Sequence, residues 1–346
     1  MDNNNFNLSN ISFVTFKTVF FSLILLLSAD FSLADSDTLS RDVSSVAPES
    51  QNKMKLAYIV SDSRIPFWAI MARGIENKAN SLGYKLDIYS SNNSARQELE
   101  STVKALKDKV SGIIVSPTNS SACVTILKFA KKAGIPVVIS DIGTDGGDYI
   151  SYISSDNRNG AYKIGKVLVK KLLALGWQNG TVGIIAIPQK RLNGQLRTTG
   201  FMQALDESGI KGADIKQQSS FSHKETYDYS RELIKKFPDL RAIWLQGSDR
   251  YQAALDAIAD SDKKDKILLI TFDAETEFLE LIPRGILVGS AMQQPYLMGQ
   301  EAVNAMDRHL NGNQVQKNQQ LPILAISADN IEKKLPTIKR NVLGIE

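Results

Sequence analysis

The sequence predicts an α/β protein with two successive Rossmann-like halves, each built on a parallel sheet. Apolar, β-branched runs alternate with amphipathic helical segments, which is the spacing of βαβ units. Several of these runs end in polar residues, as strands do when they open onto a binding cleft. The alternation restarts near residues 155–159, so two halves of similar size are expected.

Each element follows from a local signal. The first apolar run ends at Ser61, and Pro66 then opens a helix, because proline suits the first helical turn. Glycines at 83, 134, 176 and 209 end helices. The expected strands are 56–60, 84–89, 113–116, 135–140, 149–154, 181–187, 215–219, 240–246, 266–273 and 285–292. The expected helices are 69–82, 97–109, 121–133, 160–175, 195–208, 227–237, 250–260 and 298–310.

The amino-terminal residues predict export. Lys17 precedes an apolar run at 18–29, and Ser32 and Ala34 are small residues before a cleavage point at Asp35. This is the layout of a secretory signal peptide over residues 1–34. The alternative, an uncleaved anchor, is disfavoured because the run is too short to span a bilayer. Residues 35–53, rich in Ser and Asp, are expected to form a flexible lead-in.

Composition excludes several classes of protein. The 346 residues carry a formal charge of only +4 and no long basic run, so nucleic-acid binding is not expected. The single cysteine, Cys123, permits no internal disulfide, and no cysteine stands beside the cleavage point to carry a lipid. An exported protein without an anchor is retained by an outer membrane, so the periplasm is the expected location.

Enzyme chemistry has little support. The two histidines, His223 and His309, are far apart in sequence, and both are interpreted as ordinary loop or surface residues. No spacing typical of a transition-metal site, a serine nucleophile or a phosphate-binding loop is present, so no metal or cofactor is expected.

Polar and aromatic residues at the strand ends are the candidate binding residues. Phe67 and Trp68 follow the first strand, and their rings could stack on a sugar ring or a cation, or could simply pack in the core. Asp141 and Asp273 each end an apolar strand. A carboxylate there can accept hydrogen bonds from hydroxyls or an amine, or can cap the next helix.

With these residues in place, the chain resembles the type I periplasmic solute-binding proteins of the ribose- and galactose-binding class, over residues 54–330. Each phrase is weak alone, but their order and spacing are specific. The phrases are Ser61…Pro66-Phe67-Trp68, Ile114-Val115-Ser116-Pro117-Thr118, Gly134-Ile135-Pro136-Val137-Val138…Asp141, Ile153-Ser154-Ser155-Asp156-Asn157, Gly200-Phe201, Thr271-Phe272-Asp273 and Gln293.

The resemblance implies a Venus-flytrap fold, in which two lobes joined by a three-crossing hinge close on a ligand. The lobes implied are residues 54–156 with about 294–322, and residues 157–293 with about 323–346. The ligand contacts implied are Phe67, Trp68, Ser116, Asp141, Gln195, Phe221, Gly247, Asp273 and Gln293.

Departures from the family pattern predict a changed pocket. Ile65 and Gly247 stand where the family has Asn, and Ile142 and Gln195 stand where it has Arg. Two cations and two amides are lost while both acids remain, so the pocket is expected to be larger, more acidic and more apolar. Arg64, Arg197 or Arg250 could restore a positive charge, which the sequence does not decide.

The function expected is that of a monomeric, non-enzymatic receptor for a small polar ligand, a sugar or sugar-like molecule. Its membrane partner would be an ABC permease or a sensor protein. The alternative is a signalling-only receptor for a non-sugar small molecule, an amine or an autoinducer-like compound, acting on a sensor kinase or cyclase. A repressor effector domain is disfavoured, because an export signal stands where a helix-turn-helix would. A glycosidase using Asp141 and Asp273 is the weakest alternative.

Overall fold

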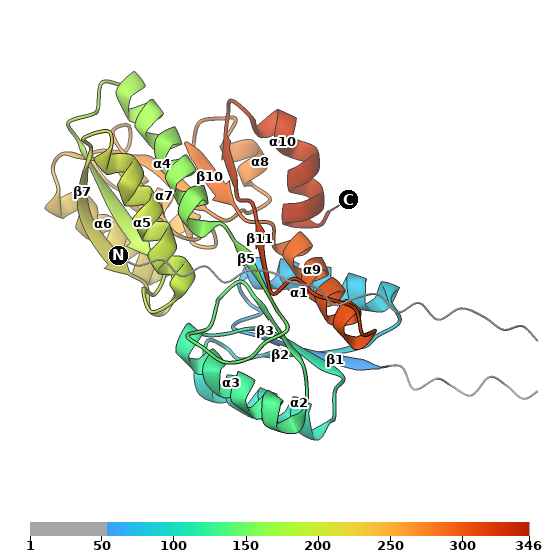
Figure 1. The fold of residues 1–346 in the computed structure, drawn as a ribbon. Coiled ribbons are helices and arrows are strands. Elements are labelled where there is room, and N and C mark those ends of the chain that lie inside the picture. Colours follow the sequence, from blue (N-terminus) through green and yellow to red (C-terminus); the bar gives the residue numbers. More distant parts are fainter. Residues whose placement is uncertain (1–53, 346) are drawn as a thin grey trace, which may run out of the picture. The chain divides into compact units, whose positions relative to one another are not determined.

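The computed structural model describes residues 54–345. The predicted signal peptide and the lead-in at 35–53 lie outside the described residues. The described part contains two six-stranded sheets (Figure 1). Among these residues, no helix combines the length and hydrophobicity needed to cross a bilayer.

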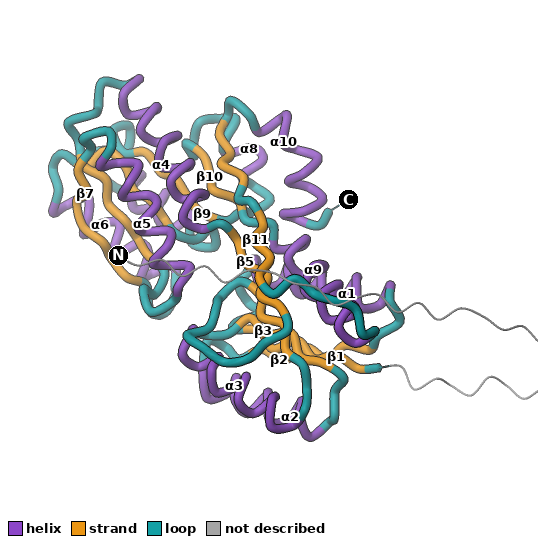
Figure 2. The backbone as a smooth tube through the Cα atoms, in the orientation of Figure 1, coloured by secondary structure: helices purple, strands orange, loops and turns teal. Residues whose placement is uncertain are grey.

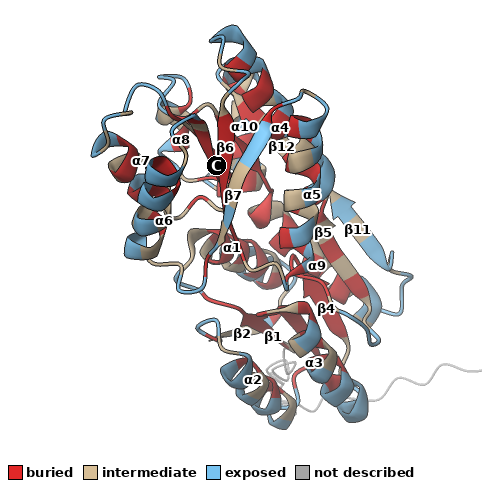
Figure 3. Ribbon diagram, turned by 90° about the vertical axis from the view of Figure 1, so that its left-hand side faces the viewer, coloured by how far each residue is buried: buried red, intermediate tan, exposed pale blue. Residues whose placement is uncertain are grey.

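The first sheet is parallel throughout and has the strand order β11-β5-β4-β3-β1-β2. Its strands are β1 (Lys55–Val60), β2 (Lys85–Ser90), β3 (Gly112–Ser116), β4 (Val137–Ser140), β5 (Ser151–Ser155) and β11 (Asn318–Leu321). Its helices are α1 (Pro66–Ser81), α2 (Ala95–Lys107), α3 (Ser120–Ala133) and α9 (Pro295–Leu310). Strands β3 and β4 are fully buried, and β1 is buried from Leu56 onward, because helices cover both faces (Figure 3).

The second sheet repeats this plan with the order β12-β10-β9-β8-β6-β7. Its strands are β6 (Thr181–Ala186), β7 (Lys211–Gln217), β8 (Leu240–Leu245), β9 (Leu268–Phe272), β10 (Gly289–Met292) and β12 (Leu324–Ser327). Its helices are α4 (Asn157–Ala174), α5 (Leu192–Asp206), α6 (His223–Lys236), α7 (Tyr251–Ala259), α8 (Phe278–Leu281), α10 (Ile331–Thr337) and a final π-helical turn, η1 (Ile338–Leu343). Only β12, at the edge, runs antiparallel to its neighbour within this sheet.

The chain passes between the sheets three times, after β5, after β10 and after β11. Figure 2 shows β5 and β11 running side by side where the two sheets approach each other, in agreement with their parallel pairing. The prediction of two parallel-sheet α/β lobes is confirmed. The short strands β11 and β12 were not predicted. Each has only four residues, which is too few to show the alternation of apolar and polar positions typical of a strand.

Glycines permit a close helix pair in the first lobe. Gly74 on α1 faces the backbone of Tyr296, and Gly299 on α9 faces the backbone of Met71. A Cβ at either glycine would overlap a carbonyl oxygen. The two helices therefore pack backbone to backbone, which holds α9 against the sheet although it follows β10 of the other lobe.

We expect Gly299→Ala to lower the free energy of unfolding by about 1–3 kcal/mol, because the added methyl group forces the two backbones apart. Gly146→Ala is the control, since a Cβ there meets no atom within 4 Å. Urea unfolding measures both variants. Equal midpoints would contradict the close-packing interpretation.

Candidate functional site

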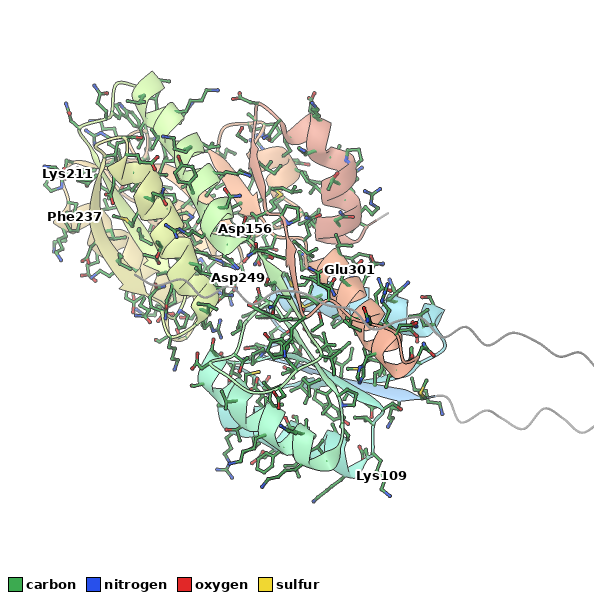
Figure 4. The ribbon with its side chains drawn as sticks, viewed as in Figure 1. Lys109, Asp156, Lys211, Phe237, Asp249 and Glu301 are labelled. Carbon is green, nitrogen blue, oxygen red and sulfur yellow. The ribbon has the colours of Figure 1, made fainter. Side chains whose placement is uncertain are left out.

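A buried cavity lies where the carboxyl ends of strands from both sheets meet. Four of its lining residues come from the first lobe and the others from the second. Figure 4 labels Asp249 on the side of the second lobe that faces the first, while Lys109 and Lys211 mark the far ends of the lobes. The lining residues are Ile65, Phe67, Trp68, Asp141, Ile187, Arg191, Asn193, Arg197, Phe221, Gln246, Gly247, Ser248, Asp249, Asp273 and Gln293.

Phe67 and Trp68 form the aromatic wall on the first lobe. They occupy the first turn of α1, directly after Pro66, with the backbone N–H of Trp68 donating to Ile65 O at 3.0 Å. Their ring centroids are 4.9 Å apart and the ring planes are nearly perpendicular. Both rings also pack in the hydrophobic core of the first lobe. The core and stacking interpretations are therefore compatible, since the same rings contribute to both.

Asp141 and Asp273 occupy equivalent positions, one after β4 and the other after β9. Both adopt left-handed backbone conformations, with φ of +66° and +68°, which aspartate tolerates better than most residues. Each backbone N–H donates at 2.9 Å to the neighbouring strand, to Ile153 O and Ala291 O respectively. Each carbonyl oxygen accepts a side-chain hydroxyl, from Tyr152 at 2.8 Å and from Ser290. The same turn therefore presents a carboxylate to the cavity from each lobe.

Both carboxyl groups are short of compensating donors. Burial raises the pKa of Asp141 to about 6, although Arg197, Arg191 and a 3.3 Å hydrogen bond from Asn193 Nδ2 oppose the shift. Burial also raises the pKa of Asp273, although Arg197 lies 3.5 Å from its Oδ2 and Gln293 Nε2 donates to its Oδ1 at 2.7 Å.

Arg197 restores positive charge to the cavity. Its side chain is only 3% exposed. Its Nε donates to Asn157 Oδ1 and its Nη1 to Gln246 O, both at 2.8 Å. It also lies 3.8 Å from the centre of the Phe272 ring. Of the other candidates, Arg64 pairs with Asp62 at 2.6 Å and Arg250 donates to Phe221 O at 2.6 Å; neither lines the cavity.

Arg191 lines the cavity but was missed by sequence reasoning. It directly precedes α5, in the second lobe, and is 6% exposed. Its Nε donates to Thr118 O at 3.1 Å and its Nη2 to Asn93 Oδ1 at 2.8 Å, both in the first lobe. Burial lowers its pKa to about 10. One side chain thus joins the two lobes and lines the cavity.

A buried glutamate holds the first-lobe side of this contact. Glu98, on α2, is fully buried and accepts hydrogen bonds from Thr118, at 2.6 Å from its N–H and 3.1 Å from its hydroxyl. Burial raises the pKa of Glu98 to about 7, although these bonds and the charge of Arg191 oppose the shift. Glu98 therefore orients the carbonyl group that Arg191 binds.

The cavity gathers most of the residues expected from the resemblance, and their contact with a ligand stays a prediction. Phe67, Trp68, Asp141, Phe221, Gly247, Asp273 and Gln293 line it. Ser116 does not, because its hydroxyl lies 3.0 Å from Tyr58 Oη within the first lobe. Gln195 does not either, since it is exposed and donates to Gln189 O.

Only some of the missed residues carried a signal. Helix α5 begins at Leu192, three residues before the predicted start, so Asn193 rather than Gln195 faces the cavity. Ser248 and Asp249 closely follow β8 and fit the pattern of polar residues after a strand end that identified Asp141 and Asp273. The residues directly after β6 are Ile187 and Pro188, so Arg191 and Asn193 carried no such signal.

Two α/β lobes, three crossings and a buried polar cavity between strand ends define a two-lobed ligand-binding protein. Within residues 54–345, no group of three or more His, Cys, Asp or Glu side chains is arranged to hold a metal ion.

The chain belongs to the periplasmic binding protein family, whose domain model matches residues 56–314. This is a family of non-enzymatic solute-binding proteins. The ribose import binding protein RbsB of Haemophilus influenzae is 28% identical over 85% of this chain and 98% of its own length. The D-allose-binding periplasmic protein of Escherichia coli is 24% identical over 70% of this chain and 79% of its own.

Solved structures show the same fold. A carbohydrate transporter solute-binding protein from Agrobacterium radiobacter, in complex with D-arabinose, superposes with a TM-score of 0.78 at 22% identity. The match covers 85% of this chain and all of that one.

We expect Arg191→Gln to shift the equilibrium between the closed and open arrangements of the lobes toward the open one, by about tenfold or more. The change removes charged hydrogen bonds across the lobes, each worth about 1.5–3 kcal/mol. Small-angle X-ray scattering would report a larger radius of gyration. Arg64→Gln is the control, because Arg64 pairs within its own lobe. An unchanged radius in Arg191→Gln would contradict the role of this contact.

Glu98 should make stability depend on pH. Its folded pKa is raised from 4.5 to about 7, so the folded state holds the proton more tightly and stability is lost as pH rises through that range. The loss amounts to up to about 3 kcal/mol. Glu98→Gln keeps an acceptor for Thr118 and should flatten the decline of unfolding free energy between pH 5 and 8. If the stability of Glu98→Gln declined as steeply with pH as that of the wild-type protein, the pH dependence would come from other groups, such as Glu275.

Proposed function

We propose that this protein is a periplasmic receptor that captures a small polyhydroxylated ligand, a sugar or sugar-like molecule, between its lobes. One observation carries the proposal: a buried cavity in which the carboxylates of Asp141 and Asp273 face the same space as the rings of Phe67 and Trp68. Carboxylates accept hydrogen bonds from neighbouring hydroxyls, and aromatic faces suit the C–H face of a sugar ring.

The size of the cavity supports a single small molecule. The space open to the centres of water-sized molecules is about 50 Å³, which favours a compact ligand over an oligosaccharide. Gly247 adds to this space, since a Cβ there would meet only Asp249, at an ordinary contact distance of 3.5 Å. The named sugars of the relatives, ribose and allose among them, are of the size expected.

The three crossings are the proposed hinge. Residues 54–156 with about 294–322 would move as one lobe, and 157–293 with about 323–346 as the other. Arg197 binds Asn157 just after the first crossing, and Gln294 Nε2 donates to Pro322 O at 2.8 Å between the other two. Closure would bury the ligand and bring Arg191 onto Thr118.

The proposed partner is an ABC import system of the inner membrane. Relatives with import in their names support this choice, as does their coverage, since most of their length aligns with this chain. The predicted signal peptide supports a periplasmic location. The closed receptor would deliver its ligand to the permease.

A thermal-shift screen against pentoses, hexoses and polyols tests the proposal. A ligand at 100 times its dissociation constant adds about 2.7 kcal/mol of stability. We expect Trp68→Ala to weaken binding of the identified ligand by about 2 kcal/mol, a roughly thirtyfold higher dissociation constant, because stacking is lost. Trp177→Ala is the matched control, since Trp177 does not line the cavity. Equal dissociation constants for Trp68→Ala and the wild-type protein would contradict the assignment of the aromatic wall to the ligand site.

A further inference from the structure

Helix α1 contacts both lobes, although it belongs to the first. Phe67 and Trp68 in its first turn line the cavity, and Met71 and Ile75 pack with them in the core of the first lobe. Ile70 instead packs in a hydrophobic core of the second lobe. The helix that carries the aromatic wall is therefore also in contact with the opposite lobe.

The second-lobe partner of α1 is the carboxyl-terminal turn, which comprises residues 338–344. Val342 and Leu343 are 1% and 2% exposed and belong to the same core as Ile70. Arg73 lies three residues after Ile70, on the same face of α1. Its Nη2 donates to Leu343 O at 2.6 Å. Apolar packing and a charged hydrogen bond thus join α1 to this turn.

Tyr296, at the start of α9, holds the same turn from a second helix of the first lobe. Its ring lies against Gly344, where a Cβ would overlap it. Gly344 also has a φ of +61°, a conformation that glycine adopts without steric cost. The hydroxyl of Tyr296 accepts a hydrogen bond from Asn77 Nδ2 at 2.9 Å, and its carbonyl oxygen lies against Gly74. Tyr296 therefore ties α1, α9 and the carboxyl-terminal turn together (Figure 1).

This contact lies outside the cavity but beside the crossings. Neither Arg73 nor Tyr296 lines the cavity. Gln294, at the second crossing, accepts a hydrogen bond from Asn341 Nδ2 and donates one to Pro322 O, both at 2.8 Å. Three single-chain crossings alone would leave the lobes free to rotate, so a packed contact beside them restricts that rotation.

We propose that Arg73 and Tyr296 are positioning residues for ligand capture, acting through the carboxyl-terminal turn. They hold α1, and with it Phe67 and Trp68, against the second lobe in the closed arrangement. A receptor that is closed more of the time binds more tightly, because less of the binding free energy is spent on closing it. Both residues therefore raise affinity without touching the ligand. The inference rests on the proposed function, since it depends on closure of the two lobes around a ligand.

Distances between spin labels on the two lobes, measured by pulsed electron paramagnetic resonance in ligand-free protein, test the inference. Lys107→Cys, at the end of α2, and Lys211→Cys, at the start of β7, place one label on each lobe at exposed sites. Cys123 is buried and stays in place. We expect Arg73→Gln to raise the fraction of long distances between the lobes about threefold, the effect of one partly exposed hydrogen bond. Arg73→Lys retains a charged donor and should restore much of the wild-type distribution.

Arg96→Gln is the matched control, because Arg96 pairs with Glu100 on its own helix. Gly344→Ala is the second variant, since its methyl group would overlap the Tyr296 ring, displace the turn from α9 and lengthen the distances as well. Circular dichroism shows whether each variant is folded. Wild-type distances in either folded variant would overturn the inference, as would an equal change in Arg96→Gln. Because no ligand is present, such a result leaves the proposed function to be judged by the thermal-shift screen.

Discussion

The buried guanidinium of Arg197 connects the strand ends and the crossing that enclose the cavity. It binds Asn157, directly after the first crossing between lobes, and Gln246, directly after β8. It lies 3.5 Å from Asp273 and stacks on Phe272, at the end of β9. A buried charge is tolerated only when it is paired and hydrogen-bonded. This requirement holds two strand ends and one crossing in a fixed relation, and the cavity is the space they enclose.

Around that centre, the two lobes repeat one structural device. A parallel strand ends, the backbone turns through a left-handed aspartate, and its carboxylate faces the partner lobe. Asp141 and Asp273 come from opposite lobes, so each carboxylate loses its water when the lobes meet. The cost of that desolvation falls on the closed state unless a donor compensates it. In the proposed closure, a ligand with suitable donors would remove the cost, which would couple binding to closure. Arg191 and Glu98 add a separate contact between the lobes at the edge of the cavity.

Sequence reasoning reached the fold and much of the cavity because both follow from local pattern. Apolar runs between amphipathic helices specify parallel strands, and parallel strands bring their carboxyl ends together. Phe67, Trp68, Asp141 and Asp273 could thus be assigned to one place. Gln195 shows the limit of this reasoning. Its assignment depended on position within a family pattern, and the start of α5 at Leu192 turned it to the surface instead.

By itself, then, the sequence determined the two-lobed architecture, the strand-end carboxylates and the aromatic pair, because periodicity and chain order specify them. Only the tertiary structure decided which positively charged side chains line the cavity. Arg191 meets residues 73 and 98 positions away in the chain, and Arg197 is bound by partners 40 to 76 positions away. No local pattern encodes such contacts, because the direction of a long side chain is set by the packing around it.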